Sequence, residues 1–492
     1  MSGELLIEFY SEEIPARMQG QAELQFARTM ESALQKGGIG FEKIQCFSTP
    51  RRLALCVSGI AKSVSRAGER KKGVRVDAPQ KAIDGFLRSV GVSDVGKLET
   101  EKDERGEHYV VNIPAKTIKT AEMIAEIVPD IVRGFPWQKS MRWGGGSLSW
   151  VRPLRSILAV LDGKIVPFSI RGVASGNVTY GHPFLAPQAI KCADFKAYQQ
   201  GLKKAFVVLE AGKRKEIIRK KAEALAAKKG LVADLDEALL SEIAALVESP
   251  HVLMGAIEKK YMNIPIEVSI SVMRSHQKYI PLTDKKGRLA PFFLITANIA
   301  DSGKMIVRGN ERVLSARLAD AQFFYDKDRQ VSLEKRAGSL GNMVFYGKTS
   351  LAEKSEGVAK LARKLAGDIE IDGKKPSIDE KKIGRTCLLA KADLLSEMVG
   401  EFPDLQGVMG GYYARHDKES KEIAQAIAEQ YKPIGKEGEL PKSPMGIVLA
   451  LAERFYILQF FWEQGKKPTS SKDPYKLRQT AIGLLRILFE NW

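Results

Sequence analysis

Cysteine and histidine are scarce in this sequence, and their spacing matches none of the common metal-site patterns. The 492 residues include four cysteines, none in a C-x-x-C pair, and five histidines, none at the i,i+4 spacing of a helical metal site. The pattern therefore gives no support to a zinc site. Few, scattered thiols are typical of reduced intracellular proteins, so we expect a cytoplasmic protein.

Long apolar runs and nucleotide-binding loops are also missing. No stretch reaches the roughly 18 uninterrupted apolar residues of a membrane-spanning helix, so we expect no membrane partner. The opening residues, "MSGELLIEFYSEEIPARM", lack the basic and apolar regions of a signal peptide. In "GNMVFYGKTS", Gly341 and Gly347 have five residues between them. A phosphate loop needs four, so we expect a strand and a turn there.

Basic residues, by contrast, are in clear excess. The 77 lysines and arginines outweigh the 59 acidic residues and give a net charge of +18. An excess of this size suggests a polyanionic partner such as RNA, DNA or an anionic membrane. A basic surface that only maintains solubility is the alternative.

The length and the hydrophobic pattern predict a multidomain α+β protein. Residues 1–194 alternate between strand-like and helix-like segments and form a mixed α/β region. Residues 195–334 continue this body with helices, such as "GNERVLSARLADAQFFYDKDR", and with strand-like runs, such as "PIEVSISVMRSHQKYIPL". From residue 335 to 492 the pattern is nearly all helical, which indicates a separate helical domain.

The adjacent pair His416–Asp417 in "GVMGGYYARHDKES" suggests the metal site of an HD-type phosphohydrolase. Such a metal needs several ligands that converge in space. Asp393 and Glu453 lie on neighbouring predicted helices, but the first histidine of the set is missing, because His276 lies outside the helical region. We therefore expect a degenerate cluster of Asp393, His416, Asp417 and Glu453, with no metal and no catalytic residue. A working metal-dependent hydrolase is one alternative.

Basic residues lie close to aromatic residues in three segments, "KSMRWGGGSLSWVRPLR", "MRSHQKYIPL" and "SKDPYKLRQ". Arginine and lysine neutralise phosphates, while aromatic rings stack on exposed bases. With the basic helix "NERVLSARLADAQ", these segments supply the candidate RNA contacts, which are Arg142, Arg152, Lys278, Arg312, Arg317, Lys472 and Arg478. For Arg312 and Arg317 the alternative is ion pairing within the helix, because acidic residues lie at helical spacing.

Several long segments occur in one order along the chain. They include "STPRRLAL", "SMRWGGGSLSWVRPLRSILAVLDGKIVP", "SHQKYIPL", "GNERVLSARLADAQFFYDKDR", "GVMGGYYARHDKES" and "SKDPYKLRQTAIGLLRIL". Together they closely resemble the β subunits of bacterial heterotetrameric glycyl-tRNA synthetases, from the first residues to the last.

The resemblance implies a fold and a role. It implies a B3/B4-like module within residues 1–334 and a degenerate HD-type domain over 335–492. It also implies an α2β2 enzyme whose α subunit carries the site for glycine, ATP and magnesium, while the β subunit is a required but non-catalytic subunit that binds tRNA(Gly). No cofactor is then expected on this chain.

Two departures from the family pattern qualify this expectation. The stretch "LAERFYIL" places Glu453 and Tyr456 where the family has an acidic run. The family also continues into a C-terminal anticodon-binding domain, which we expect to be absent here. A non-catalytic RNA-binding or assembly fragment is therefore a second alternative.

Overall fold

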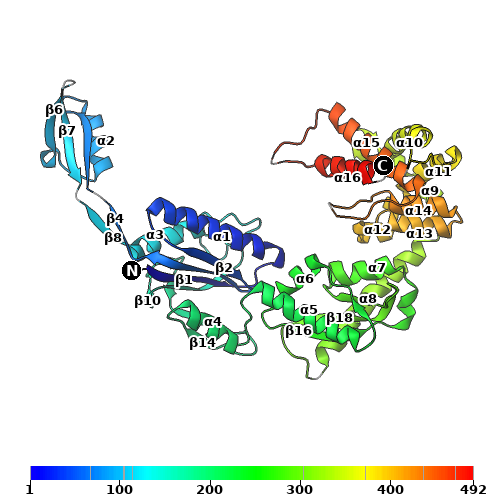
Figure 1. Ribbon diagram of the computed structural model, residues 1–492, viewed down its shortest axis with the longest axis horizontal. Helices are drawn as coiled ribbons and strands as arrows, with labels where there is room; N and C mark the ends of the chain where they lie inside the picture. Colours follow the sequence, from blue (N-terminus) through cyan, green and yellow to red (C-terminus); the bar gives the residue numbers. More distant parts are fainter. Residues whose placement is uncertain are drawn as a thin grey trace. The chain divides into compact units, whose positions relative to one another are not determined.

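The chain forms two compact units, each described separately below. In the computed structural model (Figure 1), the described residues are 2–66, 68–103, 106–113, 115–302, 304–371, 373–435, 437–470 and 472–490. Unit 1 comprises Met1–Ala224, Leu235–Leu253 and Thr296–Ser302, and unit 2 comprises Leu225–Asp234, Met254–Ile295 and Gly303–Trp492.

Unit 1 is built on a seven-stranded sheet of order β11-β12-β9-β1-β3-β2, with β10 paired to β9. Its strands are β1 (Ser2–Ser11), β2 (Lys43–Ser48), β3 (Arg52–Ala61), β9 (Leu154–Leu161), β10 (Lys164–Ile165), β11 (Ser169–Ile170) and β12 (Val173–Gly176). The central strand β1 pairs antiparallel with both β3 and β9. A central strand is buried on both faces, which explains why "LLIEFY" is apolar at every position except Glu8.

Helices cover both faces of this sheet (Figure 1). Leu5, Ile7 and Phe9 of β1 pack with α1 (Ala16–Gly37) and α3 (Thr120–Arg133). Leu6 points to the opposite face and packs with α4. The alternation follows from the two-residue period of a strand. Glu8 lies in the same buried stretch and therefore needs a partner inside the protein.

The rest of unit 1 contains smaller sheets and further helices. A ribbon of β4 and β8 and a sheet of order β5-β7-β6 accompany α2, while β13 pairs with β14. The bounds are β4 (Ser63–Arg66), β5 (Glu69–Arg75), α2 (Gln80–Val90), η1 (Val95–Lys97), β6 (Glu99–Asp103), β7 (Gly106–Ile113), β8 (Lys116–Lys119), β13 (Val178–Tyr180), β14 (Ala189–Lys191), α4 (Phe195–Lys204), α5 (Ala211–Ala227) and α6 (Glu237–Ala244).

A four-stranded sheet of order β15-β17-β18-β16 lies largely in unit 2. Its elements and the helices that follow them are β15 (Val232–Ala233), β16 (His251–Ala256), η2 (Lys259–Asn263), α7 (Ile266–Ser271), η3 (Val272–His276), β17 (Ile280–Thr283), β18 (Leu289–Ala297) and α8 (Met305–Asp328). The prediction of a strand was wrong for 266–276, which are helical. Val268, Ser271 and Val272 are buried at helical spacing there, so packing overrides their strand propensity.

The C-terminal part of unit 2 is helical, which confirms that prediction. Its elements are α9 (Leu333–Ala337), η4 (Leu340–Asn342), β19 (Val344–Tyr346), β20 (Thr349–Ser350), α10 (Leu351–Asp368), α11 (Glu380–Leu389), η5 (Ala392–Leu395), α12 (Glu397–Glu401), η6 (Pro403–Leu405), α13 (Val408–His416), α14 (Lys421–Glu429), α15 (Pro444–Glu463) and α16 (Leu477–Glu490). The strand and turn expected near Gly347 is the β19–β20 hairpin. The HD-type domain, the B3/B4-like module and the boundaries at 194 and 334 stay predictions.

One described helix, α15, is long and apolar enough to cross a membrane by length and composition alone. Of its apolar window, 61% is buried inside the protein, which is typical of a core helix.

Candidate functional site

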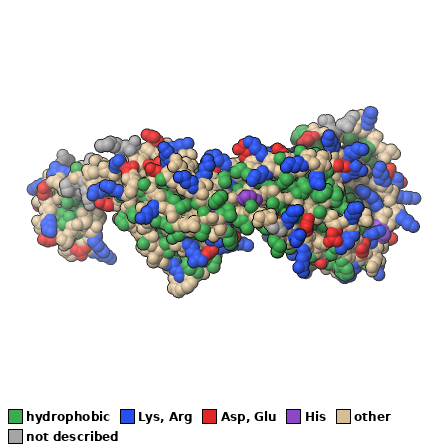
Figure 2. Space-filling model, turned by 90° about the horizontal axis from the view of Figure 1, so that it is seen from below, with side chains coloured by type: hydrophobic (Ala, Val, Ile, Leu, Met, Phe, Trp, Pro, Cys, Tyr) green, Lys and Arg blue, Asp and Glu red, His purple; other side chains and the backbone are tan. Residues whose placement is uncertain are grey.

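Basic side chains are spread over the visible face of the molecule and are interspersed with acidic ones (Figure 2). Charge density alone therefore does not locate a site. Arginines and lysines that lack an acidic partner are more informative, because an exposed ion pair already neutralises its own charge.

Helix α8 carries the clearest set of unpaired arginines. Arg312 and Arg317 are exposed, and neither guanidinium makes an ion pair or hydrogen bond with another residue in the described part of the chain. The alternative of pairing within the helix is therefore not realised. Arg308, one turn before Arg312, is also exposed and unpaired. Arg308 was not among the predicted RNA contacts, although its i,i+4 spacing from Arg312 was a usable signal.

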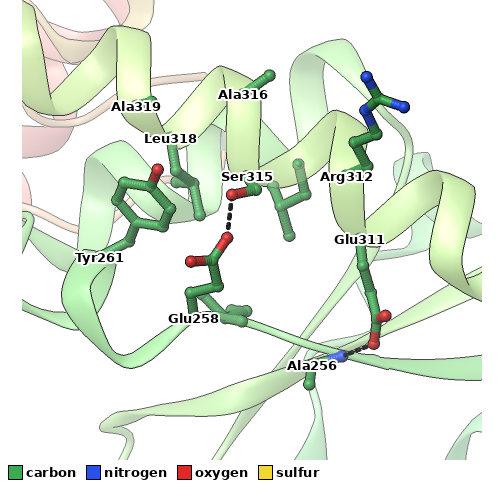
Figure 3. A pocket seen from close by; sticks show the side chains of 11 residues that line it. Ala256, Glu258, Tyr261, Glu311, Arg312, Ser315, Ala316, Leu318 and Ala319 are labelled. Carbon is green, nitrogen blue, oxygen red and sulfur yellow. Dashed lines mark hydrogen bonds between the residues drawn. The ribbon is translucent and has the colours of Figure 1, made fainter.

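A cavity of about 590 Å³ lies beside this helix, between α8 and the segment from β16 to η2. On its wall, Ser315 donates a hydrogen bond to Glu258, and Glu311 accepts one of 2.8 Å from the backbone N–H of Ala256. Figure 3 shows Arg312 extending away from these contacts. Glu311, which directly precedes Arg312 in the sequence, is thus engaged elsewhere.

The other RNA-contact candidates differ in their surroundings. Arg142 and Lys472 are exposed, and the described residues place no acid against them. Arg152 is half-buried and donates to the carbonyl of Val151 at 2.8 Å. The Lys278 ammonium donates to the carbonyl of Ser275 at 2.9 Å. Arg478 lies 3.5 Å from Asp473, at the start of α16.

Asp393 of the candidate acidic cluster is fully buried and caps α13. Its Oδ2 accepts hydrogen bonds from the backbone N–H groups of Gly407 and Gly410, the second at 3.0 Å. Its Oδ1 has no hydrogen-bond partner among the described residues. Burial raises the pKa of this carboxyl to about 6, although the two N–H groups and Lys391 oppose the rise.

Glu453 of α15 is buried between two lysines. Lys354 of α10 pairs with its carboxylate, and the ammonium of Lys391 lies 3.0 Å from the same oxygen. Burial alone would raise the pKa of Glu453, but the two positive charges lower it to about 2. The lysines supply the positive charge that a metal ion would bring to such a site.

His416 and Asp417 make different contacts. The Nδ1 atom of His416 lies 3.1 Å from the guanidinium of Arg329, and Asp417 accepts a hydrogen bond of 2.7 Å from the backbone N–H of Leu333. The charge of Lys391 thus acts on both Asp393 and Glu453. His416 and Asp417 instead contact Arg329 and Leu333, in the connection between α8 and α9. Within the described ranges, no three His, Cys, Asp or Glu side chains are grouped to hold a metal ion.

We expect Asp393→Asn to change how stability depends on pH. Asp393 in the folded protein has a pKa of about 6, above the ordinary 3.8, so the folded state binds more protons than the unfolded state between these values. The free energy of unfolding of the parent therefore falls as pH rises through this window, by about 3 kcal/mol from this group.

The variant lacks this titration, so it should gain about 2 kcal/mol relative to the parent between pH 4.5 and 7.5 in urea unfolding. Asp379→Asn, which removes an exposed carboxylate that caps α11, is the control. A constant difference between Asp393→Asn and the parent across this range would contradict the prediction.

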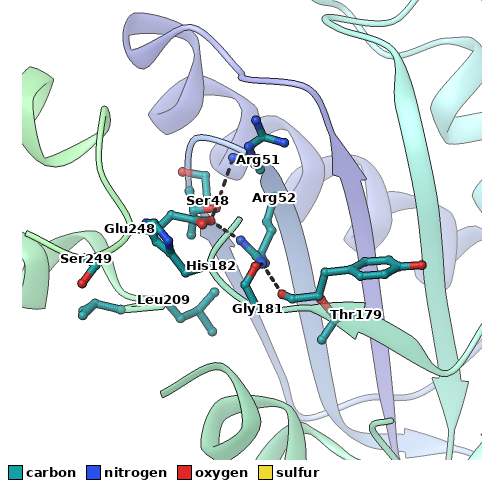
Figure 4. Close-up of polar contacts among 12 residues, drawn as sticks. Ser48, Arg51, Arg52, Thr179, Gly181, His182, Leu209, Glu248 and Ser249 are labelled. Carbon is teal, nitrogen blue, oxygen red and sulfur yellow. Dashed lines mark hydrogen bonds and ion pairs between the residues drawn. The ribbon is translucent and has the colours of Figure 1, made fainter. Parts of the chain in front are cut away.

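A buried ion network in unit 1 was not foreseen. Arg52 is fully buried and pairs with the carboxylate of Glu248 (Figure 4). The Nε atom of Arg52 also lies 3.3 Å from Glu8. Thr179 and Tyr198 each donate a hydrogen bond of 2.6 Å to Glu8. Burial raises the pKa of Glu8, whereas the two carboxylates raise the pKa of Arg52 against the effect of burial. In the sequence, the only indication of this network is Glu8, an acid within the apolar stretch "LLIEFY".

Comparison with known proteins gives one consistent result over nearly the whole chain. The family described as "Glycyl-tRNA synthetase beta subunit" matches residues 5–492. The "Glycine--tRNA ligase beta subunit" of Rhodospirillum centenum is 38% identical over 99% of this chain and 72% of its own length. Those of Cereibacter sphaeroides and Paracoccus denitrificans are 41% and 40% identical over 99% of this chain, covering 70% and 72% of their own lengths. The chain therefore belongs to the glycyl-tRNA synthetase beta subunit family.

Proposed function

We propose that this chain binds tRNA(Gly) and, with a separate α subunit, completes an α2β2 ligase that attaches glycine to tRNA at the expense of ATP. The observation that carries the proposal is the set of exposed arginines without acidic partners on α8, in a chain of net charge +18. Arginines of this kind neutralise phosphates and release counterions, so they bind a nucleic-acid backbone without reading its sequence.

The covalent chemistry belongs to the α subunit in this proposal. The buried acids that the sequence suggested for catalysis are already engaged, Asp393 by backbone N–H groups and Glu453 by two lysines. This chain would instead hold the tRNA so that its acceptor end stays close to the active site of its partner. Positioning of this kind raises the rate of aminoacylation, because the entropic cost of bringing the reactants together is met when the tRNA binds.

Charging of tRNA(Gly) with glycine, measured after the purified α subunit is added to this chain, tests the proposal. The α subunit alone is the control. Charging well above that control supports the proposal. Salt-sensitive tRNA binding without charging would favour a non-catalytic RNA-binding fragment, and failure to bind either tRNA or the α subunit would contradict the proposal.

In the same assay, we expect the double variant Arg312→Ala/Arg317→Ala to raise KM for tRNA while kcat changes little. The salt dependence of tRNA binding should also fall by about one in log–log slope for each lost phosphate contact. The control is Arg288→Ala, because Arg288 is also exposed in unit 2 but lies 2.7 Å from Asp284. Equal effects of the control and the double variant would count against α8 as the RNA contact.

A further inference from the structure

A second cavity, in unit 1, lies where α4 ends and α5 begins. Its volume is about 590 Å³, within the range of roughly 300–1,000 Å³ typical of ligand sites. It is lined by Gln199, Gln200, Lys203, Phe206, Val207, Val208, Leu209, Glu210, Lys213, Ile217 and Ser249. Its lining thus combines aliphatic side chains with polar and charged ones.

Phe206 occupies a position in this cavity that normally belongs to glycine. Helix α4 ends with the backbone N–H of Val207 donating to the carbonyl of Leu202 at 2.9 Å and that of Phe206 donating to Lys203 at 3.3 Å. This pairing places Phe206 in the left-handed region, with φ of 61°. A bulky residue there costs about 1–2 kcal/mol of backbone strain. Phe206 is nevertheless 52% exposed, so much of this aromatic side chain stays available to a ligand.

The part of the cavity wall formed by Val208 and Leu209 is held in place by buried hydrogen-bond partners. Arg214, fully buried, donates to the carbonyls of Val208 and Leu209 at 2.8 and 2.7 Å. The backbone N–H of Val208 donates to the carbonyl of Glu248 at 2.8 Å, and the carboxylate of Glu248 is held by Arg52. Leu209, Glu248 and Ser249 are labelled in Figure 4. A wall fixed by buried partners is pre-organised for a ligand.

Three polar side chains of the lining are unengaged. The amides of Gln199 and Gln200 and the ammonium of Lys203 make no hydrogen bond or ion pair with other described residues. Lys213 differs, because it lies 2.5 Å from Glu210. Amides offer both donors and acceptors, which suits the edge of a nucleobase, and a free ammonium suits a phosphate. An exposed aromatic ring suits the face of a base.

We propose that this cavity binds one unpaired nucleotide. The ring of Phe206 stacks on the base, the amides of Gln199 and Gln200 contact its edge, and Lys203 pairs with its phosphate. The inference rests on the proposed tRNA binding, since bound tRNA presents such a nucleotide. A free mononucleotide has the same chemistry and is distinguished by the experiment.

Phe206→Gly separates binding from stability. Glycine removes the backbone strain, so the melting temperature of unit 1 should rise, while loss of stacking should weaken binding of a tRNA(Gly) transcript about tenfold in fluorescence anisotropy. Phe206→Trp should bind as the parent does. Lys203→Ala should weaken binding, whereas Lys204→Ala, an exposed neighbour outside the cavity, should not.

The four nucleoside 5′-monophosphates identify the source of the nucleotide. Competition between one of them and tRNA, with both weakened in Phe206→Gly, supports a nucleotide of the RNA. Weakened mononucleotide binding with unchanged tRNA binding supports a free nucleotide instead. Unchanged binding of both in Phe206→Gly, or a lower melting temperature, would overturn the inference. Absence of any tRNA binding by the parent would contradict the proposed function itself.

Discussion

Arg52→Ala is expected to lower the free energy of unfolding of unit 1 by about 3–5 kcal/mol, because removal of one partner leaves the buried charges of the other uncompensated. Glu8 and Glu248 are at most 1% exposed, so water cannot replace the guanidinium. The variant also loses the hydrogen bond from Arg52 to the carbonyl of Gly181 at 3.3 Å. This one side chain connects β1 and β3 with the segments that carry Gly181 and Glu248.

The loss should depend on pH. Burial raises the pKa of Glu8 and Arg52 opposes that rise, so without Arg52 the Glu8 carboxyl of the folded variant binds a proton still more readily than in the unfolded chain. The folded state is therefore penalised once pH exceeds the ordinary pKa of glutamate, and the deficit relative to the parent grows from pH 5 to pH 8. An equal deficit at both pH values would show that lost packing, and not the buried charge, dominates.

The neighbouring Arg51 provides the control. It lies 3.7 Å from Glu12 and 3.6 Å from Glu13 with a partly exposed side chain. Arg51→Ala should therefore change stability by less than about 1 kcal/mol. Tryptophan fluorescence during urea unfolding measures both variants, because Trp137, Trp143 and Trp150 all lie in unit 1.

The apolar run around Glu8 shows what the sequence can and cannot determine. A continuous apolar run predicts a strand buried on both faces, and an acid within it predicts a buried counter-charge. The identity of that partner follows only from the fold, because Arg52 and Glu248 are separated by 196 positions along the chain. Long-range pairing leaves no local pattern.

For helix α8, too, the sequence predicts the element but not the partners of its side chains. Its existence followed from the periodicity of the sequence, yet the ion pairs considered for Arg312 and Arg317 within the helix are not formed in the described part of the chain. Glu311, which directly precedes Arg312, accepts a hydrogen bond from Ala256 instead. For residues 266–276 the secondary structure itself was predicted wrongly. Their β-branched residues favour a strand, but they form a helix because one helical face is buried. Phe206 was missed because the sequence did not show where α4 ends.

Glu453→Gln is the second substitution with a large expected effect. It removes the negative charge between Lys354 and Lys391, which are 5% and 4% exposed, and preserves the shape of the side chain. Two buried ammonium groups then lack a counter-charge, so we expect the helical part of unit 2 to lose about 3–5 kcal/mol. Hydrogen exchange measured by mass spectrometry on peptides from α10 and α15 localises the loss. Glu463→Gln, at the exposed end of α15, is the matched control.

The stability of the parent and that of Glu453→Gln should depend on pH in different pH ranges. Glu453 has a pKa of about 2, below the ordinary 4.5, so its contribution to stability is complete above pH 4.5 and is lost as pH falls towards 2. Burial lowers the pKa of Lys354 and Glu453 opposes that effect, so in the variant the pKa of Lys354 in the folded state falls further. The unfolded state then binds more protons at neutral pH, and the variant regains stability as pH rises towards the ordinary pKa of lysine. A deficit that stays constant between pH 7 and 9.5 would show that Lys354 is not held charged by Glu453.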